Sequence, residues 1–350
     1  MGKRDNAPMK ILFWGTPAYA VPSLDALVAA GHELVGVVSQ PDRRRGRGKE
    51  LMPSAVKARA VELGIPVFTP ERIRREPQCQ QQLAALGAEI YVVVAFGQIL
   101  PPEVLAQPPY GCWNGHGSLL PRWRGAGPIQ WCLLEGDAQT GVGIMAMEEG
   151  LDTGPVLLER AIPIGLLENA QQLATRLAQL TGDLLVEAMA RIEAAGPGPE
   201  AERLARLGVQ PQGEQGLTYA RMLSKADFQI DWDATALAIH RQVMGLYPGA
   251  HSSWQGKRLK LLATEPLVQR LADQLSPEGA ALARRWGPPA SSSSPAPGTV
   301  LAVEEGVGLV VATAGCPLLV RTAQLEGKQA ASGQSLLQQL GAGPGDQLGV

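Results

Sequence analysis

Short apolar runs alternate with stretches of helical periodicity in the first part of the chain, from Met9 to about Ala195. In order, these are the apolar run 11–14, the helical stretch 21–30, the apolar run 34–38 and the helical stretch 53–63. Residues 90–95 form a nearly continuous apolar run, typical of a central parallel strand that helices cover on both faces. The pattern therefore predicts an α/β domain with a doubly wound, Rossmann-like sheet.

We predict a long amphipathic helix at the end of this domain, because leucines recur at mostly helical spacing over 171–195. The Gly-Pro-Gly-Pro sequence at 196–199 and the polar stretch that follows have the composition of a loop. We therefore predict a first domain at 1–195 and a linker at 196–216.

The rest of the chain has short strand-like segments separated by turn residues, at 257–262, 298–303 and 308–311. This pattern predicts a small C-terminal β-barrel of the OB type at 217–350. Residues 288–295 are rich in Pro and Ser, so we expect a disordered insertion at 268–296.

Composition and charge narrow the class of protein. A chain of 350 residues with 45% apolar residues fits about two ordinary soluble domains. It has no apolar run long enough to cross a bilayer, and its first residues lack the apolar core of a secretory signal. The net charge of −2 gives no overall nucleic-acid footprint. We expect a cytoplasmic, soluble monomer that does not bind membranes.

The cysteines are too far apart for a local metal or redox motif. We therefore expect neither a zinc ribbon nor a thioredoxin-type motif, but free thiols in a reducing compartment. The cysteines are Cys79, Cys112, Cys132 and Cys316.

Side chains suited to acyl transfer follow an apolar strand start at 112–113. Ligands of open α/β sheets bind beyond the carboxyl ends of the strands, where Asn114 and His116 are expected. Because these residues are two apart on an extended backbone, their side chains lie on one face and can approach one oxygen. Donors placed in this way stabilise an oxyanion by about 3 kcal/mol each.

Asp152 lies in the loop GLDTG at 150–154, from which we expect it to reach His116. A carboxylate beside an imidazole favours the cationic ring, and the carboxylate can also receive a proton. Each motif by itself is weak, since a lone loop histidine is usually structural and Asp-x-Gly is usually a turn. Their coincidence with Leu-Leu-Pro at 119–121 and a Gly-rich turn favours a catalytic site.

The sequence NGHGSLLP at 114–121, followed by the Asp152 loop, resembles the folate-dependent formyltransferase family, whose members use an Asn, a His and an Asp. The resemblance covers nearly the whole chain apart from 1–8 and about 268–296. Further matching sequences are FWGTP at 13–17, SQPDR at 39–43, GRGK at 46–49, LMPS at 51–54, VAFG at 94–97, PRWRG at 121–125, TYA at 218–220, IDW at 230–232 and PGTV at 297–300.

The resemblance implies transfer of a formyl group from 10-formyltetrahydrofolate to the amino group of methionyl initiator tRNA, with no metal. By position, Asn114 and cationic His116 hold the oxyanion, while Asp152 orients His116 and helps to pass a proton to the folate nitrogen. The implied folate contacts are Phe96, Gly97, Gln98, Ile99, Leu100, Ser118, Leu119, Leu120 and Pro121.

The basic cluster 43–49 lies in a predicted strand-to-helix loop and is, by itself, equally well explained as a solvated charge run. In the family this loop inserts at the acceptor end of tRNA, which makes binding salt-dependent. The predicted barrel gives weaker evidence for tRNA binding because its charges nearly balance. From residue 216 onward the sequence has eleven Lys or Arg and ten Asp or Glu. The implied tRNA contacts are Arg43, Arg44, Arg45, Arg47, Lys49, Lys257, Arg258 and Lys260.

The chain departs from the family pattern at a few positions. Arg44 and Arg45 replace smaller residues, and Glu50 stands where a basic residue is common. Gly115 and Gly117 replace apolar or small side chains, and we expect each to loosen the catalytic strand at a cost of about 0.5–1 kcal/mol.

The same residues also help to distinguish this function from other functions. A dinucleotide dehydrogenase is excluded, because GTPAYA at 15–20 lacks the glycine fingerprint. A formyltransferase for a small amine would share the site, but the basic loop and the barrel argue against it. A hydrolase that releases formate needs only water in place of the amine. A tRNA-binding protein with an inactive site is disfavoured, because all three catalytic groups are present.

Overall fold

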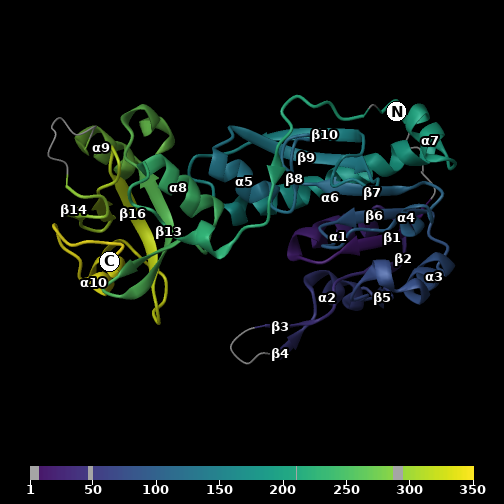
Figure 1. The fold of residues 1–350 in the computed structure, drawn as a ribbon, viewed down its shortest axis with the longest axis horizontal. Helices are drawn as coiled ribbons and strands as arrows, with labels where there is room; N and C mark the ends of the chain where they lie inside the picture. Colours follow the sequence, from purple (N-terminus) through teal and green to yellow (C-terminus); the bar gives the residue numbers. More distant parts are fainter. Residues whose placement is uncertain (1–7, 46–49, 210, 287–294) are drawn as a thin grey trace. The chain divides into compact units, whose positions relative to one another are not determined.

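The computed structural model describes residues 8–45, 50–209, 211–286 and 295–350. The chain forms two compact units that alternate along the sequence (Figure 1). Unit 1 contains Met1–Pro128, Thr140–Ile162 and Ala174–Ala220, and unit 2 contains Ile129–Gln139, Pro163–Leu173 and Arg221–Val350. The predicted division into 1–195, 196–216 and 217–350 stays a prediction, while packing assigns two short segments of the first half to unit 2.

Unit 1 is built on a mostly parallel sheet. Across this sheet the strands follow one another as β10 (Val156–Pro163), β9 (Gln139–Ala146), β7 (Cys112–His116), β6 (Ile90–Val94), β1 (Lys10–Gly15), β2 (Glu33–Val38) and β5 (Val67–Phe68). The strands from β7 to β5 are parallel, whereas β9 is antiparallel to β7. Every residue of β6 is buried, which explains its continuous apolar sequence.

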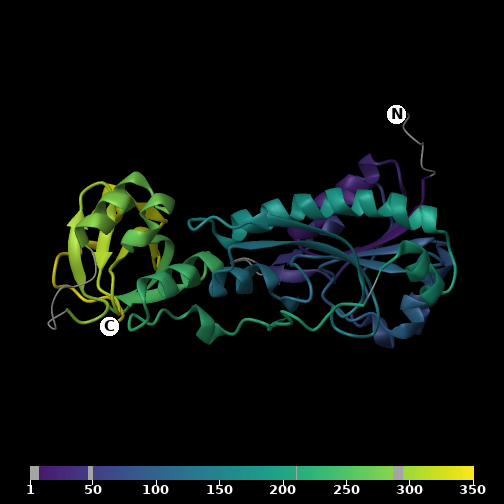
Figure 2. The ribbon, with the colours of Figure 1, turned by 90° about the horizontal axis from the view of Figure 1, so that it is seen from above.

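Helices cover both faces of this sheet, so the prediction of a doubly wound α/β domain is confirmed (Figure 2). On one face α1 (Val21–Ala29) packs against α6 (Ala170–Ala195) at Gly182, where a Cβ would lie 3.0 Å from the carbonyl oxygen of Pro22. On the other face, α3 (Pro77–Ala85) and α4 (Pro102–Leu105) contribute to a core with Trp14 and Tyr91. At the edge of the sheet, α2 (Ala55–Glu62) begins at Ser54, whose hydroxyl accepts the amide hydrogen of Lys57.

Helix α6 is the long amphipathic helix that the leucine spacing predicts. Its leucines at 173, 177, 184 and 185 are buried, whereas residues 175, 176, 179 and 183 on the other face are exposed. Within the described part of the chain, neither α6 nor any other helix is long and apolar enough to cross a membrane.

The segment 196–216 contains more than the loop that its composition predicts. Helix α7 (Glu200–Leu207) forms within it, and its buried Arg203 donates to the carbonyl oxygens of Tyr110 at 2.8 Å and Gly198 at 2.9 Å. The bond to Tyr110 spans 93 residues and holds α7 against an earlier part of unit 1, a contact that local composition does not reveal. Further along, β11 (Tyr219–Ala220) pairs in parallel with β8 (Arg124–Gly125).

The basic cluster that we placed in a loop begins on a strand. β3 (Arg43–Arg45) pairs antiparallel with β4 (Glu50–Met52), so Arg43 lies opposite Met52 and Arg44 opposite Leu51. The expectation of a plain loop was therefore wrong at 43–45, where backbone pairing with β4 forms a strand, whereas residues 46–49 lie outside the described residues.

Unit 2 contains an antiparallel sheet with short connections, which confirms the predicted C-terminal β domain. Its strands follow one another as β12 (His251–Trp254), β13 (Lys257–Pro266), β16 (Leu318–Leu325), β15 (Gly308–Val311) and β14 (Val300–Glu304), and β17 (Ala331–Ser332) pairs with β16. Helices α8 (Ala236–Gly245) and α10 (Gly333–Leu340) share one apolar core with this sheet.

Two segments from the first half of the chain pack within unit 2. Helix α5 (Pro128–Glu135) lies against α8, since a Cβ on Gly245 would be 3.2 Å from the carbonyl oxygen of Gln130. The segment 163–173 is held by His240 of α8, whose Nε2 donates to the carbonyl oxygen of Leu166 at 2.7 Å.

The expected disorder of 268–296 is wrong for its first part. Residues Gln269–Gln274 form a 3-10 helix and Pro277–Trp286 form α9. Leu282 of α9 is buried in a core that includes Val310 and Leu319 of the sheet, and this burial stabilises the helix. Residues 287–294, which contain most of the low-complexity sequence, lie outside the described residues.

Candidate active site

Strand β7 presents Asn114 and His116 on one face and Gly115 on the other, as the two-residue spacing predicts. Asn114 is half-buried and the His116 side chain is buried. Gly115 faces α6, where a Cβ would lie 2.5 Å from Cγ2 of Thr181. Gly115 therefore allows a close helix–strand contact, while the expected loosening of the strand stays a prediction.

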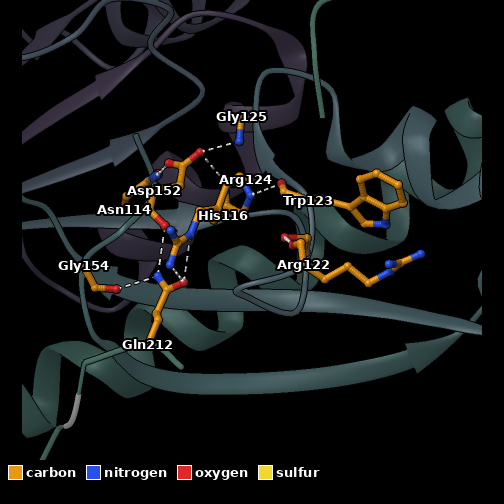
Figure 3. A network of polar contacts seen from close by, with 10 residues as sticks. Asn114, His116, Arg122, Trp123, Arg124, Gly125, Asp152, Gly154 and Gln212 are labelled. Atoms are coloured by element: carbon orange, nitrogen blue, oxygen red, sulfur yellow. Dashed lines mark hydrogen bonds and ion pairs between the residues drawn. The ribbon is translucent and has the colours of Figure 1, made fainter. Parts of the chain in front are cut away.

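Asp152 reaches the same place from the loop after β9. Its Oδ2 accepts the amide hydrogen of Gly125 at 2.8 Å, and its Oδ1 accepts from Nδ2 of Asn114 at 3.4 Å (Figure 3). Oδ2 also lies 3.6 Å from Nδ1 of His116, an ion pair whenever the ring is protonated. The structure thus brings together the three predicted catalytic residues.

The orientation of the His116 ring distinguishes its two nitrogens. Nε2 lies 2.9 Å from the carbonyl oxygen of Trp123. Because a carbonyl accepts only from a nitrogen that carries hydrogen, this contact assigns the proton to Nε2 of the neutral ring. Nδ1 is then the nitrogen that faces Asp152 and the reaction space, and a second proton on Nδ1 makes it a donor there.

A glutamine from the far end of unit 1 completes this network, and the sequence did not predict it. Nε2 of Gln212 donates to the carbonyl oxygens of Asp152 at 2.9 Å and Gly154 at 2.7 Å. Its Oε1 accepts from Nη2 of Arg124 at 2.8 Å and from Nε of the same residue at 3.2 Å (Figure 3). No motif marks Gln212, since it lies in a polar stretch sixty residues after Asp152.

The predicted folate residues at 96–100 divide into a buried and an exposed group. Phe96 and Leu100 belong to the core, with Phe96 stacked edge-on against Trp14 at 5.1 Å between ring centroids. Gly97 and Ile99 are exposed. The side-chain oxygen of Gln98 accepts the amide hydrogen of Ile73 at 2.9 Å, and this bond holds the segment 96–100 against Ile73.

The second predicted folate segment, 118–121, lies directly after the catalytic strand. Ser118 is fully buried and donates to the carbonyl oxygen of Arg122 at 2.6 Å, whereas the next three residues are half-buried. An open pocket of about 430 Å³ adjoins Leu120 and Pro121 and shares Gln212 with the polar network. Its lining consists of Leu120, Pro121, Val156, Leu157, Arg191, Leu207, Gly208, Val209, Pro211, Gln212 and Gly213.

The predicted tRNA contacts fall in both units. On β3, Arg43 and Arg44 are exposed, Arg45 ends the strand, and Arg47 and Lys49 lie outside the described residues. On β13, Arg258 and Lys260 share the face opposite the buried Leu259, and Lys257 is exposed at the start of the strand. The structure therefore offers cations on two strands, one in each unit.

The cysteines are free, as predicted, and burial raises the pKa of the Cys112 thiol. Across the described residues, no group of three or more His, Cys, Asp or Glu is placed to hold a metal ion.

Comparison with known sequences agrees with this arrangement. The formyl transferase family model matches residues 9–189, and the formyl transferase C-terminal domain model matches residues 222–341. A methionyl-tRNA formyltransferase of Synechococcus sp. (strain RCC307) is 72% identical over 95% of this chain and 100% of its own length. One of Prochlorococcus marinus (strain MIT 9313) is 60% identical over 97% of this chain and 99% of its own length.

Solved structures share the fold at low sequence identity. WlaRD, a sugar 3N-formyl transferase determined in the presence of dTDP and 5-N-formyl-THF, has a TM-score of 0.58 at 15% identity, over 93% of this chain and 100% of that one. HypX from Aquifex aeolicus, in complex with tetrahydrofolic acid, has a TM-score of 0.59 at 16% identity, over 95% of this chain and 48% of that one. With both parts of the sequence matched and relatives that are 60–72% identical over nearly its whole length, the chain belongs to the methionyl-tRNA formyltransferase family.

Proposed function

We propose that this protein transfers the formyl group of 10-formyltetrahydrofolate to the amino group of methionyl initiator tRNA. The observation that carries the proposal is the convergence of Asn114 and His116 on Asp152, whose carboxylate oxygens lie 3.4 Å from the Asn114 amide and 3.6 Å from the His116 ring. Two potential donors and one carboxylate at one point suit the addition of an amine to a formyl carbon.

Asn114 and His116 hold the oxyanion in this proposal. The Asn114 amide has two hydrogens, and only one of them is directed at Asp152, so the other is available to the formyl oxygen. The protonated Nδ1 of His116 supplies the second donor, because its Nε2 is already bound to Trp123. Asp152 keeps this ring oriented and stabilises its positive charge.

The reaction conserves atoms and charge. The methionyl amine attacks the formyl carbon and forms a C–N bond, which turns the formyl oxygen into the oxyanion. When that oxyanion collapses, the bond from the formyl carbon to folate nitrogen breaks. Asp152 takes the proton that the amine loses, directly or through water, and passes it to the leaving nitrogen.

Exposure in the structure supports part of the proposed substrate contacts. Phe96 and Leu100 lie in the core and are not proposed as folate contacts. The proposed folate contacts are the exposed or half-buried Gly97, Ile99, Leu119, Leu120 and Pro121. The proposed tRNA contacts are the basic cluster 43–49 and the cations of β13. We propose that they bind phosphates and the acceptor end of the tRNA. A cytoplasmic monomer is part of the same proposal.

The deciding experiment follows labelled formyl from 10-formyltetrahydrofolate to charged initiator Met-tRNA, elongator Met-tRNA and free methionine. Label confined to the initiator tRNA supports the proposal. His116→Ala should lower kcat about hundredfold or more, whereas His32→Gln, at an imidazole away from the site, should not. Label that appears only as formate, or only on small amines, contradicts the proposed substrate.

A further inference from the structure

We infer that Gln212 is a positioning residue, which fixes the Asp152 loop against the turn that contacts His116. The inference rests on the proposed formyl-transfer site and adds to it a residue from outside the family motifs discussed above. Gln212 lies in the last part of unit 1, from which the chain leads into unit 2 at Arg221.

The side-chain amide of Gln212 uses its full bonding capacity. Nε2 donates to the carbonyl oxygens of Asp152 at 2.9 Å and Gly154 at 2.7 Å, and Oε1 accepts from the guanidinium of Arg124 at 2.8 Å and 3.2 Å. A glutamine has two N–H donors and one carbonyl acceptor, so no part of the group is left over. Figure 3 shows this amide between the loop and the arginine.

The Asp152 loop needs such a restraint. Asp152 has a φ of 53°, in the left-handed region that non-glycine residues seldom adopt, although Asp tolerates it better than most. Gly154 lies against β9, where a Cβ would be 1.8 Å from the carbonyl oxygen of Ala146. Gln212 binds the carbonyl groups of both residues and thereby sets the direction in which the Asp152 carboxylate points.

The other end of Gln212 acts on the turn 122–126. Arg124 is buried and neighbours both Trp123, whose carbonyl accepts from His116, and Gly125, whose amide donates to Asp152. Thr218, six residues after Gln212, binds the same turn: its hydroxyl accepts the amide hydrogen of Trp123 at 2.9 Å and its carbonyl that of Arg124 at 3.0 Å. The segment 212–220 therefore holds the backbone atoms that orient two of the three catalytic residues.

Two substitutions separate the functions of this amide. Gln212→Met keeps the length and apolar volume but removes all four contacts. Gln212→Glu keeps an acceptor for Arg124 but places a carboxylate oxygen against the carbonyls of Asp152 and Gly154. We expect each to lower kcat about ten- to hundredfold, with a smaller change in KM for the formyl donor, because the reacting groups are displaced and not removed. Gln215→Met, at an exposed position of the same segment, is the matched control.

The readouts are the pH profile of kcat and the NMR signals of the Gly125 amide and the His116 ring in the full chain. The inference predicts a displaced pH profile and displaced signals in both Gln212 variants, at an unfolding midpoint close to that of Gln215→Met. Wild-type kcat, unmoved signals, or a loss of kcat explained by unfolding alone would overturn it. If the wild type formylates no tRNA, the proposed function fails, but the Gly125 and His116 signals still decide whether Gln212 positions the site.

Discussion

Asp152 combines a strained backbone with a carboxylate that faces three donors. Its φ of 53° suits Asn and Asp better than other non-glycine residues, because their short polar side chains stabilise the left-handed conformation. Its two oxygens face the amide of Gly125, the amide of Asn114 and the imidazole of His116. An isosteric replacement therefore tests the charge of this residue without disturbing its backbone.

Asp152→Asn is expected to lower kcat about hundredfold or more while the free energy of unfolding changes by less than about 1 kcal/mol. The new amide still offers an oxygen to Gly125 and His116, but it directs a donor at the donating amide of Asn114 and cannot take a proton. Single-turnover formylation and thermal unfolding of the same preparation check both parts. Glu149→Gln removes an exposed carboxylate of the same loop and should leave kcat unchanged; equal losses in the two variants would show that loop charge, and not Asp152, matters.

The sequence could predict the catalytic residues because their spacing and chemistry are local. Asn114 and His116 are two apart on a strand, and Asp152 follows in a glycine-bounded loop. Gln212 could not be predicted, since its role depends on a contact across sixty residues. Phe96 and Leu100 could not be assigned to the core either, because an apolar residue after a strand suits a pocket wall and a core equally well.

At the scale of elements, the contact between β7 and α6 limits what the catalytic strand can carry. Thr181 of α6 occupies the space where a side chain at Gly115 would lie. Its hydroxyl donates to the carbonyl oxygen of Leu177 at 2.7 Å and lies 2.9 Å from the hydroxyl of Tyr19, whose pKa burial raises to about 12. The helix is thus anchored at the point where it touches the strand.

Gly115→Ala should destabilise the protein by about 1–3 kcal/mol and lower kcat, because the new Cβ meets Cγ2 of Thr181 and displaces Asn114 and His116. Thr181→Ser removes only that methyl group and keeps the hydroxyl, so it should restore both properties in the double variant. A double-mutant cycle in unfolding free energy and in kcat measures the coupling. Additive effects would contradict the proposed contact.

Elements with strong periodicity, such as β6 and α6, follow the sequence prediction closely. Helix α9 was not predicted, because its short apolar face is stabilised by Val310 and Leu319, which lie in later strands. Strands β3 and β4 were missed for a similar reason: neither the all-arginine β3 nor the three-residue β4 has an apolar alternation, and only their pairing makes them strands.

At the scale of the whole molecule, one buried imidazole secures a segment of the first half of the chain within unit 2. His240 donates from Nε2 to Leu166, and its Nδ1 lies 3.0 Å from the hydroxyl of Thr264. Burial lowers the pKa of His240 below its ordinary value of 6.5, although the contact with Leu166 and the nearby Glu265 act in the opposite direction. Arg241 adds to the lowering.

The sign of the resulting pH dependence follows from this shift. Below about pH 6.5 the unfolded chain binds a proton that folded His240 does not, so stability is lost as the pH falls, by at most about 1.4 kcal/mol per pH unit. We expect the free energy of unfolding of His240→Gln to fall less steeply between pH 7 and 5 than that of the wild type. Denaturant titrations at each pH, with His251→Gln as the control imidazole, measure this difference; parallel curves for wild type and His240→Gln would contradict it.

The alternation of the two units along the chain has a consequence for how such a protein can be rearranged. Because unit 2 includes 129–139 and 163–173, the chain passes from one unit to the other at five places. A recombination event with one crossover after residue 220 would therefore deliver a C-terminal part without α5 and without Leu166, the acceptor of His240. We therefore expect an exchange of the C-terminal part to keep unit 2 intact only when residues 129–139 and 163–173 are exchanged with it.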